Sequence, residues 1–102
     1  MLLLCASRTI AQSWFFEGYQ SSNPSSGLCP SNPVTEGSGS NTFPCTSEPE
    51  GFNCIQYDGA LVWDIVMYTS EDCSGAGTTR GAGATGNLAF FSTFHSWQIV
   101  RA

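Results

Sequence analysis

The sequence contains no lysine, and its arginines are few: Arg8, Arg80 and Arg101. Eight Asp and Glu residues outnumber them, so the formal net charge is -5. A surface with this balance repels phosphate groups, which disfavours nonspecific binding to nucleic acids and to anionic membranes. We therefore expect neither nucleic acid among its partners nor insertion into a membrane.

The sequence also lacks a long hydrophobic run. Its apolar N-terminus, Met1 to Ala6, is far too short to span a bilayer. It has the character of a secretion signal, although a positive n-region is missing and the usual apolar core has ~7–15 residues. Thr9 and Ala11 place small residues at the two positions that signal peptidase reads. We interpret residues 1–11 as a truncated signal peptide; the alternative is an apolar N-terminal strand.

The number of cysteines is odd: Cys5, Cys29, Cys45, Cys54 and Cys73. Cleavage after Ala11 would remove Cys5 and leave four, the even number expected for two disulfides in an oxidising compartment. We therefore predict a secreted, extracellular protein in which these four cysteines form disulfides. Four cysteines allow three pairings. Closely spaced Cys pairs of the CxxC kind are absent, so no zinc site is expected.

A helical apolar period is missing as well, which predicts an all-β fold in a single domain, residues 12–102. Several segments have the composition or alternation of strands: 13–19, 52–57, 61–69, 88–92 and 94–100. The stretch 20–51 is too long for a structureless loop in a compact domain, so we expect short strands near Val34 and near Thr42 and Phe43. Asp58-Gly59 is typical of a hairpin turn between apolar runs.

The sequence repeats itself. Trp14 to Tyr19 corresponds to Trp63 to Tyr68, each with Trp and Tyr five positions apart. The phrase Phe52-Asn53-Cys54-Ile55-Gln56 is answered later by Phe94-His95-Ser96-Trp97-Gln98. Two copies of one supersecondary unit usually pack together. We predict two Greek-key motifs, about 13–57 and 61–101, that form a small disulfide-stapled β-sandwich.

The second half resembles a βγ-crystallin Greek-key motif, in which two aromatics with four residues between them are followed, after one more residue, by Gly. Here Tyr68 and Gly75 match, Cys73 takes the place of the second aromatic, and Ser96 matches a Ser that opens the last strand. The first half departs from the pattern, and Cys54 stands where that Ser would be. The chain is similar, over about 13–101, to small secreted fungal proteins of crystallin-like or killer-toxin-like type.

This resemblance implies a monomeric binding protein without enzymatic activity, with a host-interaction or antagonistic role and a protein or glycan as partner. It also implies the pairing Cys29–Cys45 with Cys54–Cys73; the pairing Cys45–Cys54 with Cys29–Cys73 stays open. Many members bind calcium through adjacent Asp or Asn residues. The corresponding stretches, 50–54 and 92–96, lack such a pair, so no calcium is expected.

An enzymatic alternative comes from residues 39–44 and 50–52, which are similar to a stretch of fungal guanine-specific ribonucleases. Those enzymes use two His, a Glu and an Arg. Arg80 and His95 could fill two of these roles and Asp64 would replace the Glu, but Cys45 stands where the second His is expected. The loss of one acid–base group costs about 10²–10⁴ in rate, so we predict no catalytic residues.

The aromatic side chains suggest a third function, a carbohydrate-binding module. Trp14 and Phe16 are predicted on one face of the first strand, with Phe15 and Tyr19 on the other. Most aromatics belong to the core, but either Phe15 or Tyr19 could be exposed and stack on a sugar.

Residues 81–86 match the GxGxxG pattern of dinucleotide-binding loops. That site requires a following helix and an acidic residue about 20 positions later, beyond the end of this chain. We interpret the glycines as part of a β loop and expect no cofactor.

Overall fold

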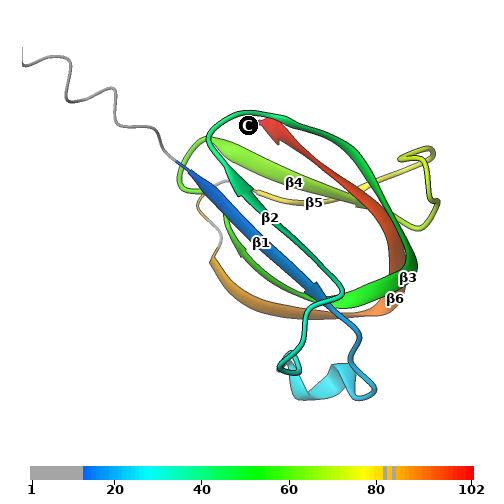
Figure 1. Ribbon diagram of the computed structural model, residues 1–102. Coiled ribbons are helices and arrows are strands. Elements are labelled where there is room, and N and C mark those ends of the chain that lie inside the picture. The colour runs from blue at the N-terminus through cyan, green and yellow to red at the C-terminus, as the bar shows by residue number, and fades with distance from the viewer. Residues whose placement is uncertain (1–12, 82, 84) are drawn as a thin grey trace, which may run out of the picture.

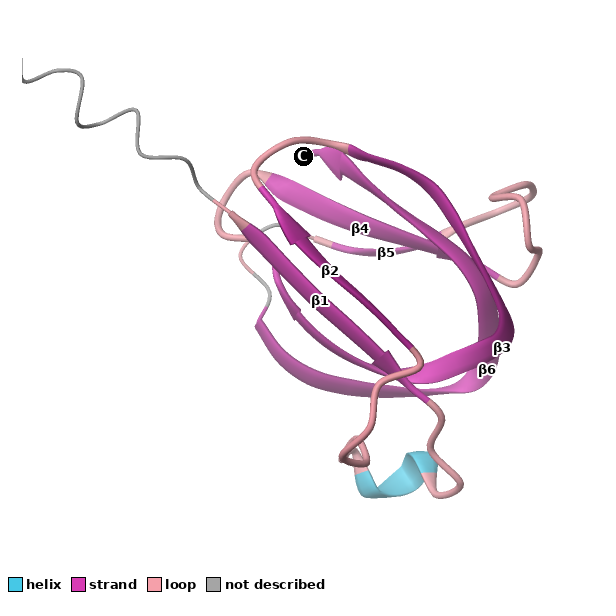
Figure 2. Ribbon diagram, viewed as in Figure 1, coloured by secondary structure: helices cyan, strands magenta, loops and turns pink. Residues whose placement is uncertain are grey.

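A computed structural model describes residues 13–81, 83 and 85–102. The predicted leader, residues 1–11 with Cys5, lies outside the described residues. The elements, in chain order, are β1 Trp14–Tyr19, the 3-10 helix η1 Pro24–Ser26, β2 Thr35–Gly39, β3 Phe43–Asp58, β4 Trp63–Tyr68, β5 Thr78–Arg80 and β6 Thr85–Arg101. The predicted all-β class is confirmed, and Figure 2 shows strands joined by loops, with one helical turn among the described residues.

The strands form one antiparallel sheet in the order β2-β1-β3-β6-β4-β5. Figure 1 shows β1 and β2 on the near side and β4 and β5 behind them, while the long strands β3 and β6 curve together along one side. The C-terminal half of β3 pairs with the N-terminal half of β6, and residues 43–47 of β3 pair with residues 96–99 of β6. Each long strand therefore belongs to both layers of a sandwich-like fold.

β3 bends at Gly51, where the pairing with β6 shifts register between Ser47 and Phe52. Gly51 has φ 79, a left-handed conformation that side chains disfavour. An added Cβ would lie 2.6 Å from Thr93 Cγ2 and 2.9 Å from His95 Cε1. Glycine is thus required at position 51 for two reasons. The backbone angle disfavours any side chain, and Thr93 and His95 of β6 fill the space that a Cβ would occupy.

The two halves of the chain pair their strands in the same register. Tyr19 of β1 lies opposite Cys54 of β3, and Tyr68 of β4 lies opposite Ser96 of β6. The C-terminal half of β3 lies beside β1, as a Greek key requires. Residues 43–47, however, pair with the other half of the chain. The Greek-key arrangement therefore stays a prediction, while the sandwich-like sheet is observed.

Alternating apolar residues fill the space between the layers. The predicted shared face of Trp63, Ile65 and Met67 is buried, as are Trp14 and Phe16. Other buried members of the core are Phe52, Ile55, Tyr57, Phe94, Trp97 and Ile99. Burial of side chains this large is the main source of stability in a domain of this size.

Trp97 lies at the centre of an aromatic cluster. Its ring is 4.6 Å from the ring of Phe16 and stacks on Phe43 at 5.4 Å. Two of the three buried tryptophans have these indole acceptors: Trp97 Nε1 donates to Thr35 Oγ1 at 3.1 Å, and Trp14 Nε1 donates to the Asn41 backbone oxygen at 2.8 Å. These bonds tie β2 and the chain after it to the core.

Several predicted elements are corrected. Residues 88–92 and 94–100 belong to one strand, β6, and residues 52–57 are the second half of β3. The strands expected near Val34 and Thr42 are present as β2 and the start of β3. The short strand β5 was not predicted, because three residues of Thr and Arg carry no periodic signal.

The hairpin predicted at Asp58-Gly59 is wrong. Among the described residues β3 pairs with β1 and β6, and β4 pairs with β5 and β6. Asp58 Oδ1 accepts the N–H of Ala60, and the chain turns across to the other layer. A side chain at Gly59 would collide with the Tyr57 hydroxyl and the Trp63 backbone oxygen, so this glycine reflects crowding at a crossover.

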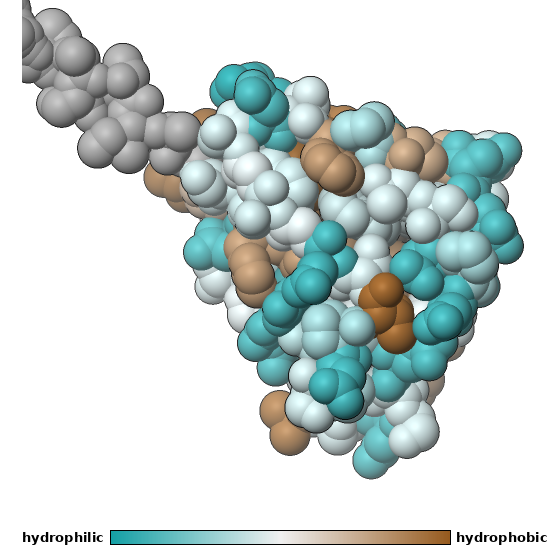
Figure 3. All heavy atoms as spheres, viewed as in Figure 1, coloured by the Kyte–Doolittle hydropathy of each residue, from teal (hydrophilic) through white to brown (hydrophobic). Residues whose placement is uncertain are grey.

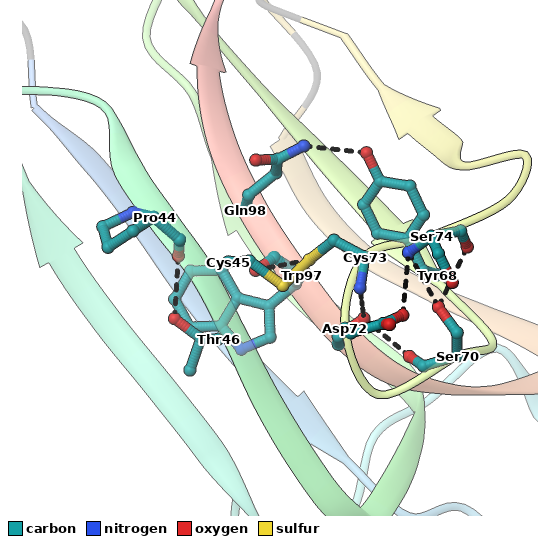
Figure 4. Close-up of a disulfide and its surroundings, with 11 residues drawn as sticks. Pro44, Cys45, Thr46, Tyr68, Ser70, Asp72, Cys73, Ser74, Trp97 and Gln98 are labelled. Carbon is teal, nitrogen blue, oxygen red and sulfur yellow. Dashed lines mark hydrogen bonds between the residues drawn. A yellow bond between two sulfur atoms is a disulfide. The ribbon is translucent and has the colours of Figure 1, made fainter.

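The four predicted cysteines form two disulfides, Cys29–Cys54 and Cys45–Cys73. Both pairings named in the sequence analysis are wrong, and the third is present. The reason is the register of the strands. Cys54 lies opposite the end of β1, where the loop that carries Cys29 begins. Cys45 lies on the half of β3 that pairs beside Trp97, and the Cys73 sulfur faces the Trp97 backbone oxygen (Figure 4).

Candidate binding surface

The outer face of the layer formed by β2, β1, β3 and the start of β6 carries two rows of side chains. Residues that lie opposite each other across neighbouring strands project to the same side. The first row runs Ser38, Phe15, Asp58, Thr85, and the second runs Glu36, Glu17, Gln56, Asn87. All of these residues are exposed or half-buried. The face is therefore polar with a single aromatic ring.

Phe15 is 43% exposed, whereas its neighbours Trp14 and Phe16 are buried. It lines a shallow hollow of about 240 Å³ together with Gln56, Tyr57, Asp58, Thr85 and Gly86. This volume is below the ~300–1,000 Å³ of drug-sized pockets, so it suits one ring rather than a large ligand. Of the two aromatics that the sequence left undecided, Phe15 is the exposed one and Tyr19 is buried.

The face is acidic. Glu17 and Glu36 lie directly opposite each other on β1 and β2, and Asp58 is diagonal to Glu17 across β1 and β3. Directly opposed like charges destabilise a sheet. The hydroxyl of Tyr19 donates a hydrogen bond to Glu17 Oε1. The pKa of Tyr19 is raised to about 12. Burial of its hydroxyl is the larger cause, and the hydrogen bond to Glu17 is the second.

Basic side chains are absent from both rows. Of the two arginines within the described residues, Arg101 packs its guanidinium over the Trp63 ring at 4.8 Å. Arg80 has a buried Nε, and its Nη2 donates to the Thr85 backbone oxygen at 2.9 Å. Within the described part of the chain, positive charge thus reaches the face only at its Thr85 corner, and the opposite corner, at Glu17 and Glu36, is the most negative part.

A second hollow, of about 250 Å³, lies at the bend of β3 and is lined by Gln20, Ser21, Glu50, Phe52, Asn53 and Thr93. Its polar groups bond to one another. Gln20 Nε2 donates to the Glu50 backbone oxygen at 2.7 Å. The Ser21 backbone N–H donates to Asn53 Oδ1 at 2.7 Å, and Asn53 Nδ2 donates to the Ser21 backbone oxygen at 3.0 Å. These bonds hold the loop after β1 against the bend, so they serve the fold.

The residues of the ribonuclease alternative are not gathered. His95 Nδ1 is 3.3 Å from the Glu48 backbone oxygen at the bend. Arg80 lies opposite Ile65, which in turn lies opposite Ile99. The Arg80 backbone is therefore two strands, or ~10 Å, from β6 at Ile99, and His95 lies four residues, or ~13 Å, further along β6; the Arg80 guanidinium contacts the far end of that strand, at Thr85. Asp64 adjoins Ile65, and Cys45, at the position expected for the second His, is in a disulfide.

The two stretches compared with calcium-binding motifs, 50–54 and 92–96, form the bends of β3 and β6. The side-chain amide of Asn53 is already engaged by Ser21. In the described part of the chain no group of three or more His, Cys, Asp or Glu residues is placed to hold a metal ion. Gly81 and Gly83 lie between β5 and β6, and Gly86 belongs to β6.

Exposed apolar residues outside this face are scattered. Leu28, Leu61 and Phe91 are the most exposed of them. Figure 3 shows that the side of the molecule seen in Figure 1 is mostly hydrophilic or neutral, with apolar residues in separate spots. The hollow at Phe15 is distinguished by the polar side chains that surround its aromatic ring. Sequence reasoning named Phe15 but missed its companions, because they depend on the register of three strands.

Comparison with known proteins gives no match: no family model matches the sequence, and no curated protein and no solved structure is significantly similar to it. Among residues 13–81, 83 and 85–102, no helix has the length and apolar character needed to cross a membrane.

Proposed function

We propose that this chain is a secreted, disulfide-bonded binding protein without catalytic activity, and that the outer face around Phe15 binds a glycan. The observation that carries the proposal is the exposed Phe15 ring in a hollow lined by Gln56, Asp58 and Thr85. Two intramolecular disulfides are typical of proteins of oxidising compartments, which supports secretion.

A glycan fits the chemistry of this face. A sugar ring has an apolar side of C–H groups, which packs on an aromatic ring, and an edge of hydroxyls. Around Phe15 the carboxylate of Asp58 accepts hydrogen bonds, the hydroxyl of Thr85 donates or accepts, and the amides of Gln56 and Asn87 do both. A small apolar platform with a few convergent polar groups is the usual form of a small-molecule site.

The absence of catalysis is supported by the separation of His95 from Arg80. General acid–base catalysis requires both groups within hydrogen-bond reach of one substrate, about 2.6–3.2 Å. The crystallin-like assignment is supported by the equal registers of the two halves, with Cys54 and Ser96 at matching positions. In such a protein, recognition of a glycan on another cell's surface would serve a host-interaction or antagonistic role. Two alternatives remain. One is a ribonuclease, and the other is a carbohydrate-binding module that binds sugars without a host-interaction or antagonistic role.

Glycan-array binding of the secreted protein tests the proposal. We expect binding by the wild type and its loss in Phe15→Ala. The matched control is Phe91→Ala, because Phe91 is 84% exposed and lies six residues along β6 from Thr85, about 20 Å away. Equal loss in both variants, or no glycan bound by the wild type, contradicts the proposal. RNA cleavage that His95→Ala abolishes would favour the ribonuclease instead.

Mass spectrometry of the same secreted material tests whether the leader is removed and the disulfides are formed. We expect a mature chain that begins at Gln12, with both disulfides intact. A protein retained in the cytosol with free thiols would contradict secretion.

A further inference from the structure

The described side chains of the proposed glycan face carry a net negative charge that a neutral sugar does not use. Glu17 and Glu36 are opposed across β1 and β2, where side chains on one face have Cβ atoms ~4.5–5.5 Å apart. Asp58 is a diagonal neighbour of Glu17, at ~7–8 Å. Both distances are within the ~8 Å Debye length at physiological salt, so the charge of Glu17 adds to that of each of the other two carboxylates.

Two independent features of this face favour a cation. The first is the acidic group of Glu17, Glu36 and Asp58, since a bound positive charge would relieve their repulsion. The second is the ring of Phe15, because the face of an aromatic ring attracts an ammonium group within about 6 Å of its centroid. A ring beside carboxylates is the combination that recognises organic ammonium ions, and here both lie on neighbouring positions of β1 and β3.

The remaining side chains distinguish between kinds of cationic ligand. A lysine-rich peptide would need carboxylates alone. The rows also hold Ser38, Gln56, Thr85 and Asn87, which supply uncharged donors and acceptors suited to hydroxyl groups. A second copy of this chain is disfavoured, since each copy has a net charge of -5.

We infer that the outer face binds a glycan of amino sugars whose amines are free and protonated, with one ring on Phe15 and an ammonium toward Glu17 and Glu36. This rests on the proposed function and specifies its ligand. The ammonium is placed at that corner because Arg80 lies at the opposite one, beside Thr85. N-acetylation of the same sugar removes the charge and adds bulk, so it should weaken binding.

The test compares three probes by calorimetry with the whole secreted protein: an oligomer of β-linked glucosamine, its N-acetylated counterpart of equal length, and oligolysine. We expect the free amino oligomer to bind at least about tenfold more tightly than the acetylated one. We also expect this preference to fall at ~1 M salt, where the Debye length is ~3 Å. Phe15→Ala should abolish binding of either sugar.

Charge variants locate the effect. Glu36→Gln should weaken binding of the amino oligomer about two- to fivefold and leave the acetylated oligomer unchanged. The matched control is Glu71→Gln, which removes the same charge from an exposed loop after β4. Equal weakening by both variants would overturn the inference, since it would reflect net charge alone.

The outcomes separate the two proposals. If the acetylated oligomer binds as tightly as the free amine and Phe15→Ala abolishes it, the glycan site stands and the charge inference fails. If oligolysine binds as tightly as the amino oligomer, the inference also fails, and the partner is a basic peptide. If neither oligomer binds, the charge inference fails; if the glycan array also shows no binding by the wild type, the proposed function fails as well.

Discussion

Cys54 and Ser96 occupy the same position in the two halves of the molecule, opposite Tyr19 and Tyr68 respectively. Each anchors the loop that follows its tyrosine. Cys54 does so covalently, through its disulfide with Cys29. Ser96 does so with hydrogen bonds, since its Oγ donates to the Ser70 oxygen at 2.6 Å and accepts the N–H of Cys73 at 3.0 Å. One structural task is thus performed by two kinds of chemistry.

The first prediction concerns Ser96→Ala. Ser96 is fully buried, so its loss leaves the Cys73 N–H and the Ser70 oxygen without their partner, at a cost of about 1–3 kcal/mol in the free energy of unfolding. Urea unfolding measures this. Ser47→Ala is the control, because Ser47 lies opposite Ser96 on β3 but is exposed; its effect should stay within about 0.5 kcal/mol. Equal effects of the two variants would show that the buried bonds add nothing.

The second prediction concerns the order in which the disulfides are reduced. Cys45 is exposed and Cys73 half-buried, whereas Cys54 is fully buried. A reductant should therefore open Cys45–Cys73 first (Figure 4). Alkylation and peptide mapping at limiting reductant would detect labels at these two residues before Cys29 and Cys54. Simultaneous labelling of all four would mean that reduction requires global unfolding.

The third prediction concerns the bend at Gly51. Gly51→Ala imposes both a left-handed backbone on a side chain and a collision with Thr93 and His95. Gly27→Ala imposes only the first, because Gly27 has φ 72 and nothing within 4 Å of an added Cβ. We expect about 1–2 kcal/mol of destabilisation for Gly27→Ala and clearly more for Gly51→Ala, measured by urea unfolding. Equal destabilisation by the two variants would mean that Thr93 and His95 of β6 move away from the added Cβ at no cost in free energy.

The fourth prediction concerns pH. Burial and the bond to Glu17 raise the pKa of Tyr19 from its ordinary value of 10.0 to about 12, so the folded state holds this proton more tightly than the unfolded state does. The resulting stability is complete below pH 10 and is lost as the pH rises from 10 toward 12.

A spectrophotometric titration of the phenols checks this. Glu17→Gln should lower the pKa of Tyr19 only in part, because burial is the larger cause and remains. Glu71→Gln, remote from Tyr19 in the loop after β4, should leave the titration unchanged. An unaltered titration in Glu17→Gln would contradict the assigned bond.

Local patterns were sufficient for part of this structure. Period-two burial at Trp63, Ile65 and Met67 follows from the sequence directly, and the alignment of Cys54 with Ser96 follows from the internal repeat. The disulfide pairing did not follow, because it depends on which strands become neighbours. Asp58-Gly59 misled for the same reason: its local turn chemistry is present, but the chain then crosses to the other layer.

The candidate site shows the same limit. Exposure of either Phe15 or Tyr19 could be expected from a strand with aromatics on both faces. The placement of Asp58 and Thr85 beside Phe15 required the register of β1 with β3 and of β3 with β6. Those registers are set by contacts between residues 27 to 56 positions apart in the sequence, which no short window of sequence contains.

The curved strands β3 and β6 have a consequence for how the chain can be divided. One end of the long strand of each half pairs within the layer formed by the other half. Neither half therefore forms a complete hydrophobic core alone. Cys45 of one half is bonded to Cys73 of the other, so cleavage in the turn at residues 59–62 should leave the halves joined, and the two fragments should unfold once reduction separates them.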